Sequence, residues 1–223
     1  MCGRFQLDFS LEDLERYYKL IDELGERKNE AKHNRINNSS DESNNAKIVQ
    51  EDILAIQGVR FPDNSSLIVT NESLKLLNWG FPFNNKLIIN ARGESIFEKR
   101  MFSKAILSRR CLVPANLFFE WKDKVKYEIK LREEKVFSMA GIYSIFHTKD
   151  GNFQERYLII TTEANEDMKS IHHRMPVIVP PSLEKDYLNP HSSPEEIISM
   201  LKPYKKGSLL IKSMNNHEQL SLF

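Results

Sequence analysis

Cys2 is the residue of this chain whose position could give it unusual chemistry. Removal of Met1, which a small second residue permits, would leave an α-amine and a thiol on adjacent carbons. The α-amine has an ordinary pKa of about 7.7–8.0, so very roughly a tenth of it is neutral at pH 7. A neutral amine attacks an aldehyde to give an imine, and the neighbouring thiol can close onto the imine carbon as a thiazolidine ring. The alternative is a cysteine without a chemical role, as lone cysteines usually are.

Two further segments carry polar residues in positions suited to catalysis. Asn90-Ala91-Arg92-Gly93-Glu94 follows an apolar stretch, and an Asn and an Arg at a strand end can bind a sugar or a phosphate. An ordinary helix cap with a surface ion pair is the other interpretation. Glu120 stands among the aromatic residues of Phe118-Phe119-Glu120-Trp121. Burial there would suit its carboxyl group to proton transfer, although in a strand it could equally face solvent.

The densest polar cluster of the chain is Ile171-His172-His173-Arg174-Met175-Pro176. Two adjacent histidines in a strand would point to opposite sides and make a poor metal-binding pair, so no metal site is predicted. One histidine could serve as a general acid while Arg174 holds a phosphate. A solvated loop before a strand is the alternative.

The composition excludes several classes of protein. The 223 residues include 32 Lys and Arg against 31 Asp and Glu, so the chain is not a globally cationic nucleic-acid binder, although a local basic patch remains possible. The two cysteines cannot form a disulfide framework. No glycine-rich phosphate loop occurs, and no apolar run is long enough to cross a bilayer. We expect a cytoplasmic protein that contacts no membrane and needs no cofactor.

Apolar periodicity predicts the elements that must position these residues. Residues 10–24 have the spacing of a helix that Ser10 caps and Gly25 ends, and the Asn- and Ser-rich residues 26–47 predict a flexible loop. Short apolar stretches then recur as strands, with helices expected near residues 95–109, 183–188 and 194–201. Many strands with few helices predict one α+β domain over residues 1–223. Its mainly antiparallel sheet is expected to be curved and barrel-like, and residues from about 190 to 223 to be peripheral.

Seven blocks of residues in this order closely resemble the SOS-response-associated peptidase (SRAP) family, also called abasic-site processing proteins. The resemblance covers residues 1 to about 190. The blocks are Met1-Cys2-Gly3-Arg4-Phe5, Trp79-Gly80, Asn90-Ala91-Arg92-Gly93-Glu94, Arg110-Cys111-Leu112-Val113-Pro114-Ala115, Phe119-Glu120-Trp121, Thr161-Thr162-Glu163-Ala164-Asn165 and His172-His173-Arg174-Met175-Pro176.

The resemblance implies a DNA-repair protein that recognises abasic sites in single-stranded DNA and crosslinks to them covalently through its N-terminal cysteine. It implies lyase, reversal and self-processing peptidase activities as side reactions. Carried over position by position, it makes Cys2 the nucleophile, Asn90 the residue that orients the amine and sugar, Glu120 a proton shuttle and His172 an acid or base. It also implies four DNA contacts: Arg4, Trp79, Arg92 and Arg174.

Two other functions stay open on the sequence. A single-stranded DNA-binding module of the same fold, without chemistry, would bind salt-sensitively and form no covalent product. A general cysteine peptidase would need a histidine that activates the thiol, whereas an N-terminal aminothiol is better suited to aldehydes. We expect a monomer that associates with the nucleoid when bound to damaged DNA.

Overall fold

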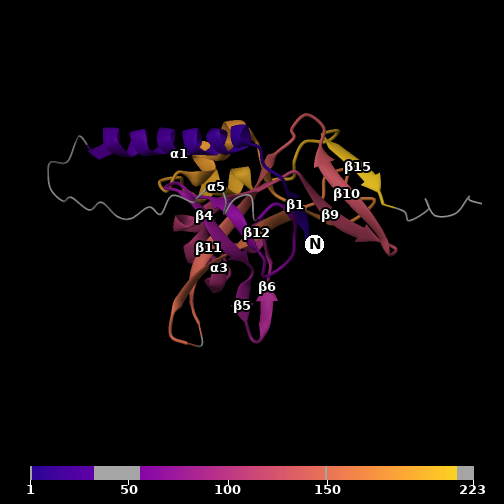
Figure 1. Cartoon of the computed structure of the whole chain (residues 1–223), viewed down its shortest axis with the longest axis horizontal. Coiled ribbons are helices and arrows are strands. Elements are labelled where there is room, and N and C mark those ends of the chain that lie inside the picture. The colour runs from indigo at the N-terminus through magenta and orange to yellow at the C-terminus, as the bar shows by residue number, and fades with distance from the viewer. Residues whose placement is uncertain (1, 33–55, 149, 215–223) are drawn as a thin grey trace, which may run out of the picture.

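The computed structural model describes residues 2–32, 56–148 and 150–214 of the chain (Figure 1). Strands dominate it, because short apolar stretches recur between tight turns. The strands are β1 (Phe5–Leu7), β2 (Gly58–Arg60), β3 (Ser65–Val69), β4 (Leu74–Trp79), β5 (Phe81–Phe83), β6 (Lys86–Ile88), β7 (Asn90–Arg92), β8 (Arg110–Ala115), β9 (Leu117–Lys122), β10 (Val125–Leu131), β11 (Phe137–His147), β12 (Phe153–Glu163), β13 (Arg174–Pro176), β14 (Ile178–Val179) and β15 (Leu209–Ser213).

The larger sheet closes into a barrel. Its strands follow the order β12-β4-β3-β8-β11, and β11 pairs again with β12, so the ring has no open edge at that point. β7 and β13 attach to β12, and β14 attaches to β11. All of these pairs are antiparallel except those of β12 with β4 and with β7. The α+β class and the barrel-like, mainly antiparallel sheet predicted from the sequence are confirmed.

A second sheet, with the order β15-β10-β9-β1-β2, lies beside the barrel and carries the N-terminal strand (Figure 1). Separately, β5 and β6 form a hairpin that extends away from the barrel at the bottom of the view. Asn84 and Asn85 form its turn with positive φ angles of 47° and 60°, as a two-residue hairpin turn requires. The hairpin joins the end of β4 to the start of β7, so it connects two segments that carry predicted site residues.

Four α-helices and two short 3-10 helices complete the described chain. They are α1 (Leu11–Lys32), η1 (Gly93–Ser95), α3 (Arg100–Ser108), η2 (Pro181–Leu183), α4 (Glu184–Leu188) and α5 (Pro194–Met200). The four α-helices overlap the helices expected from the sequence, whereas η1 and η2 lie mainly before the expected ranges. Helix α1 runs across the top of the molecule (Figure 1) and buries Leu14, Tyr17, Leu20 and Leu24 in the common core.

Helix α1 begins as predicted but continues past the predicted end. The Ser10 hydroxyl accepts from the Asp13 amide at 3.2 Å, and the Asp13 carboxylate accepts from the Ser10 amide at 2.8 Å, which is a reciprocal cap. The expectation that Gly25 ends the helix is wrong, because the helix extends to Lys32. Gly25 does not adopt the left-handed conformation of a C-terminal cap, and its missing side chain only weakens the helix. Of the predicted 26–47 loop, residues 26–32 are therefore helical, and residues 33–47 lie outside the described part.

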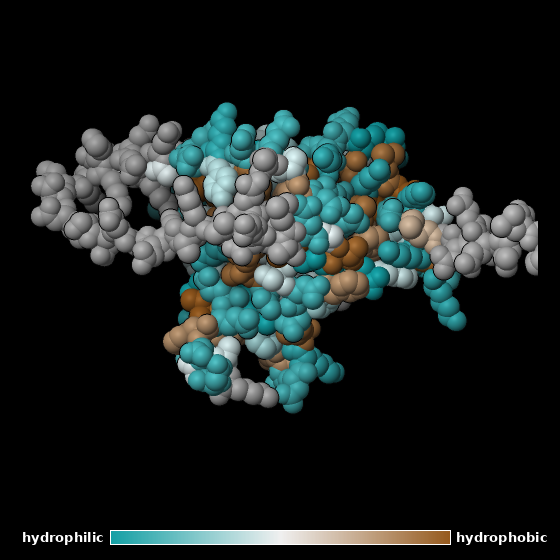
Figure 2. Space-filling model, viewed as in Figure 1, coloured by the Kyte–Doolittle hydropathy of each residue, from teal (hydrophilic) through white to brown (hydrophobic). Residues whose placement is uncertain are grey.

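The face of the molecule seen in Figure 2 is mainly hydrophilic, with apolar residues scattered between the hydrophilic ones. No helix in the described part of the chain is long and apolar enough to cross a membrane. The proposed extent of the domain and the peripheral place of residues 190–223 stay predictions.

Candidate active site

Cys2 is fully buried and lies three residues before the start of β1. Its Sγ donates weakly to the Arg4 carbonyl oxygen at 3.9 Å. Burial and the nearby charge of Glu120 raise the pKa of the Cys2 thiol well above its ordinary range. The resting side chain is therefore a neutral thiol and not a thiolate. The second cysteine, Cys111, is equally buried inside the barrel, where burial also raises the pKa of its thiol.

Glu120 comes next to Cys2 because β1 and β9 are antiparallel neighbours. Phe5 lies opposite Phe118, and the Phe119 amide donates to the Arg4 carbonyl at 3.0 Å. Continued by two residues, this register places Gly3 opposite Glu120. Glu120 is only 3% exposed. Of the two orientations that the sequence allowed, inward or toward solvent, it therefore adopts the inward one. A buried carboxylate beside a buried thiol can take up the proton that the thiol must release.

Asn90 begins β7, which runs parallel to β12 with Asn90 opposite Ile159. Both polar atoms of its side-chain amide, Oδ1 and Nδ2, are buried and have no hydrogen-bond partner in the described part of the chain. Buried amides in native proteins are normally bonded, because an unpaired polar group costs about 1–3 kcal/mol. An amide left in this state suits a position that a substrate completes.

The His172 ring is held by the backbone of Arg174. The Arg174 amide donates to His172 Nδ1 at 2.9 Å, and the same ring nitrogen lies 3.1 Å from the Arg174 carbonyl oxygen. Both contacts are made by Nδ1, so they fix the orientation of the ring. Of the two alternatives drawn from the sequence for the histidine pair, the loop before a strand is the one that forms, because His172 and His173 precede β13; their rings stack with centroids 4.4 Å apart. Desolvation, His172 and the charges of Arg174 and Arg92 lower the pKa of His173.

Arg174 forms the most extensive polar contact of the site. Its guanidinium donates to both carboxylate oxygens of Glu94 at 2.8 Å and to the Thr161 carbonyl at 2.7 Å. The Arg174 side chain is 7% exposed and that of Glu94 is 46% exposed. Glu94 belongs to η1, directly after β7, so this ion pair ties the Asn90 segment to the His172 segment. The guanidinium predicted to hold a phosphate is largely occupied by protein groups.

The other two predicted arginines are more accessible. Arg92 ends β7 with an exposed side chain, and its charge acts on His173. The Arg4 guanidinium lies between two rings, 4.4 Å from the centroid of Phe61 and 4.9 Å from that of Trp121. Both rings are partly exposed, so the cation is held at the surface beside the buried Cys2.

Trp79 is fully buried, so in this structure its ring has no surface on which a DNA base could lie. It lies between the parts of the site instead. The ring contacts Phe5 of β1 at 5.3 Å between centroids, and its Nε1 donates to the Ile89 carbonyl at 2.9 Å, one residue before Asn90. Trp79 thus contacts both β1, which follows Cys2, and the residue that precedes β7, which begins with Asn90. Its contact with DNA stays a prediction, without an exposed ring to support it.

Sequence reasoning quoted Glu94 and Trp121 within motifs but assigned neither a role, and it missed Phe61. A role for Glu94 could have been inferred, because its carboxylate is a possible partner for the charge of Arg174. No local pattern indicates that Phe61, far along the chain, would meet Arg4. In the described part of the chain no group of His, Cys, Asp and Glu side chains could hold a metal ion.

Fold and site together define a small α+β protein with a buried N-terminal cysteine thiol, a neighbouring carboxylate and an outer set of arginines and histidines. A family model described as SOS response associated peptidase (SRAP) matches residues 1–217. The chain belongs to this family.

Relatives and solved structures agree with this assignment. The abasic site processing protein YoqW of Bacillus subtilis is 38% identical over 172 residues, which cover 68% of this chain and 77% of that protein. The abasic site processing protein HMCES of Gallus gallus is 31% identical over 114 residues, which cover 40% of this chain and 34% of that protein. A crystal structure of a Bacteroides thetaiotaomicron protein superimposes with a TM-score of 0.73 at 29% identity, covering 96% of this chain and 93% of that one.

Proposed function

We propose that this protein processes abasic sites in single-stranded DNA by forming a covalent thiazolidine crosslink through Cys2 after Met1 is removed. The single observation that carries the proposal is a fully buried Cys2 beside the buried Glu120, in a chain of the SRAP family. An abasic sugar equilibrates with an open aldehyde, which is the electrophile that an aminothiol needs. The names of the relatives support the same substrate class.

The reaction runs in two bond-forming steps. The neutral α-amine of Cys2 adds to the aldehyde carbon, and loss of water gives an imine. The Cys2 sulfur then adds to the imine carbon and loses its proton, while the imine nitrogen gains one, so the ring closes without an oxidant or a second reactant. Holding the thiol next to the amine makes the second step intramolecular, which favours it strongly.

We assign the surrounding residues by what their groups can do. Asn90 offers an unpaired amide to the sugar hydroxyls or the amine, and Glu120 exchanges protons with the amine and thiol. His172, whose ring is oriented by the Arg174 backbone, acts as an acid or base at the sugar. Arg4 and Arg92 hold phosphates that flank the lesion. These roles, like a monomeric state, a cytoplasmic and nucleoid-associated location, and lyase, reversal or self-processing side reactions, are part of the proposal.

A crosslinking assay tests the proposal directly. Tag-free protein is mixed with a single-stranded oligonucleotide that holds one abasic site, and the products are analysed on a denaturing gel and by intact mass. We expect a heat-stable adduct on protein that lacks Met1, no adduct with Cys2→Ala, and a normal adduct with the control Cys111→Ala, which removes the other buried thiol. Equal adduct yields from Cys2→Ala and wild type would refute the mechanism. Salt-sensitive binding without any adduct would favour a DNA-binding module.

A further inference from the structure

The loop that carries His172 is fastened to a distant part of the chain. This loop, residues 164–173, closes on itself through the Ala164 amide, which donates to the His173 carbonyl at 3.0 Å. Inside it the amide of His172 donates to the Met168 carbonyl at 3.0 Å, and Met168 is fully buried in the core. The position of His172 therefore follows the position of the turn that begins at Asn165.

Asn165 links that turn to the C-terminal segment. Its side chain is largely buried, and its Oδ1 accepts from the Met168 amide at 3.1 Å. On the other side its Nδ2 donates to the carbonyls of Tyr204 and Lys205 at 3.0 and 3.3 Å. One amide thus bonds to two segments that lie about 40 residues apart.

Asp167 makes a second link to the same segment. Its carboxylate accepts from the Gly207 amide at 2.8 Å and from the Leu209 amide at 3.3 Å. We call residues 204–208, the last part of the segment between α5 and β15, the strap. Gly207 has a φ of +81°, a conformation that suits glycine, so the chain can turn here and present its amide to Asp167.

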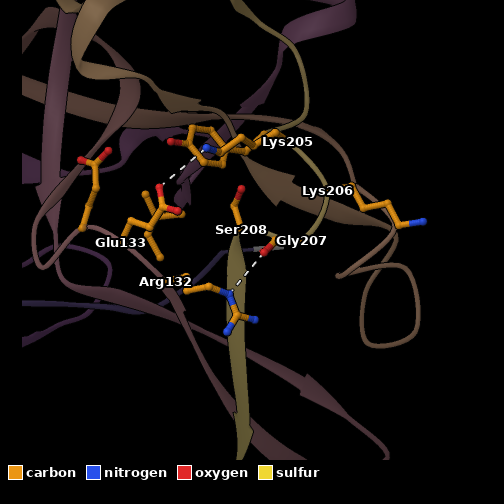
Figure 3. Close-up of a pocket in the computed structure, with 9 residues that line it drawn as sticks. Arg132, Glu133, Lys205, Lys206, Gly207 and Ser208 are labelled. Atoms are coloured by element: carbon orange, nitrogen blue, oxygen red, sulfur yellow. Dashed lines mark hydrogen bonds and ion pairs between the residues drawn. The ribbon is translucent and has the colours of Figure 1, made fainter.

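The strap is held by hydrogen bonds to the His172 loop and by Tyr204, which packs against the core. A cavity of about 200 Å³ lies between it and the turn after β10, lined largely by charged side chains. Figure 3 shows Arg132 reaching the Gly207 carbonyl and Lys205 facing Glu133 across this cavity. The Arg132 amide also donates to the Ser208 carbonyl at 2.9 Å. With a cavity beside it, the strap depends on Asn165 and Asp167 for its attachment to the His172 loop.

The strap leads directly to the sheet that carries Glu120. It continues into β15, which pairs with β10 through Leu209 opposite Leu131. β10 in turn pairs with β9, where Tyr127 lies opposite Glu120. Backbone pairing therefore continues from the strap through β15 and β10 to β9, the strand that carries Glu120, whereas the His172 loop connects β12 and β13 of the barrel sheet.

We propose that Asn165 and Asp167 are positioning residues that fix His172 relative to Glu120 by holding the His172 loop to the strap. The inference rests on the proposed crosslinking function for its activity test. Asp167→Ala removes one of the two links between the loop and the strap, and it leaves the bonds of Asn165 to the strap and to Met168 in place. Because displacement of a reacting group by about 1 Å can cost about 100-fold in rate, we expect this variant to form the adduct about 10- to 100-fold more slowly.

The experiment compares Asp167→Ala with Glu166→Ala, a matched control in the same loop whose exposed carboxylate pairs with Lys169. Single-turnover adduct rates and the Kd for uncleaved single-stranded DNA are measured for both, together with hydrogen exchange of residues 164–173. We expect Asp167→Ala to lose rate at an unchanged Kd and to exchange faster in this loop. Glu166→Ala should match wild type, and Asp167→Asn, whose amide oxygen still accepts from Gly207, should recover much of the rate.

The readouts separate the two ways of failing. A wild-type protein that forms no adduct refutes the proposed function, and the exchange data then still decide whether Asp167 holds the loop. A wild type that reacts, with Asp167→Ala reacting equally fast or showing unchanged exchange in residues 164–173, overturns the inference. Asn165→Ala serves as the second variant and is expected to show the same pattern as Asp167→Ala.

Discussion

Arg92 and Arg174 differ in accessibility. This difference predicts that Arg174→Gln lowers the stability of the protein, whereas Arg92→Gln weakens the salt dependence of DNA binding. Arg92 has an exposed side chain, whereas the Arg174 guanidinium is 7% exposed and bonded to Glu94 and Thr161. The resemblance to the family implies that both hold phosphates. The structure supports that role more strongly for Arg92. Arg174 instead joins the Asn90 and His172 segments through its bonds to Glu94.

The magnitudes follow from the contacts. Hydrogen bonds to charged groups contribute about 1.5–3 kcal/mol each when buried. Since the Glu94 side chain is 46% exposed, solvent screens its part of the interaction, and we expect Arg174→Gln to cost about 2 kcal/mol in total. For a chain of this size, that loss lowers Tm by about 4–8 °C. Arg92→Gln removes an exposed charge and should leave Tm within about 2 °C.

Salt titrations of DNA binding provide the discriminating assay. Each phosphate neutralised in a single strand contributes about 0.7 to the slope of log K against log salt concentration. Arg92→Gln should lower the magnitude of that slope by about 0.7, whereas Arg174→Gln should leave the slope unchanged. A slope that falls equally in both variants, with Tm unchanged in Arg174→Gln, would refute our reasoning, since it would mean that the Arg174 guanidinium contacts DNA.

Three further predictions concern stability and reactivity. Gly25→Ala should raise the free energy of unfolding by about 0.5–1 kcal/mol, measured by urea denaturation, because Gly25 lies inside α1 with open space around it. Both thiols should resist a thiol reagent such as DTNB in the native protein and react together on unfolding, since burial raises both pKa values; fast native labelling of Cys2 would contradict this. Burial raises the pKa of Glu184 above its ordinary 4.5, so the folded state binds this proton more tightly than the unfolded state does. Its contribution to stability should therefore increase as pH falls from neutral toward about 4.5, and urea titrations should show no such contribution in Glu184→Gln.

The periodic parts of the fold were predictable, and the parts set by tertiary contacts were not. Alternating segments such as the one that became β10 gave the strands, and Ser10 with Asp13 gave the start of α1. The predicted end of α1 at Gly25 was wrong, because a glycine ends a helix in this way only where it adopts the left-handed conformation. The residue type alone does not reveal that conformation. The closure of β11 on β12 depends on pairings that no local pattern specifies.

The candidate site divides in the same way. Residue types and the resemblance pointed to Cys2, Asn90, Glu120 and His172, and their predicted roles still await the assays above. Burial decided what sequence could not: Glu120 faces inward, and the Trp79 ring is enclosed. The Glu94–Arg174 pair joins residues 80 positions apart, so it became visible only when the barrel brought β7 and β13 to the same strand, β12.

The state of the Cys2 thiol orders the steps of the proposed reaction. A cysteine peptidase attacks as a thiolate, which requires a lowered thiol pKa. Here burial and the Glu120 charge both act in the opposite direction, so a thiolate is the less available nucleophile. The α-amine, with an ordinary pKa of about 7.7–8.0, supplies a neutral nucleophile without such help. Attack by the amine would come first, and the thiol would follow by giving its proton to Glu120 as it closes on the imine. The electrostatics of this site thus favour aldehyde chemistry over peptide hydrolysis.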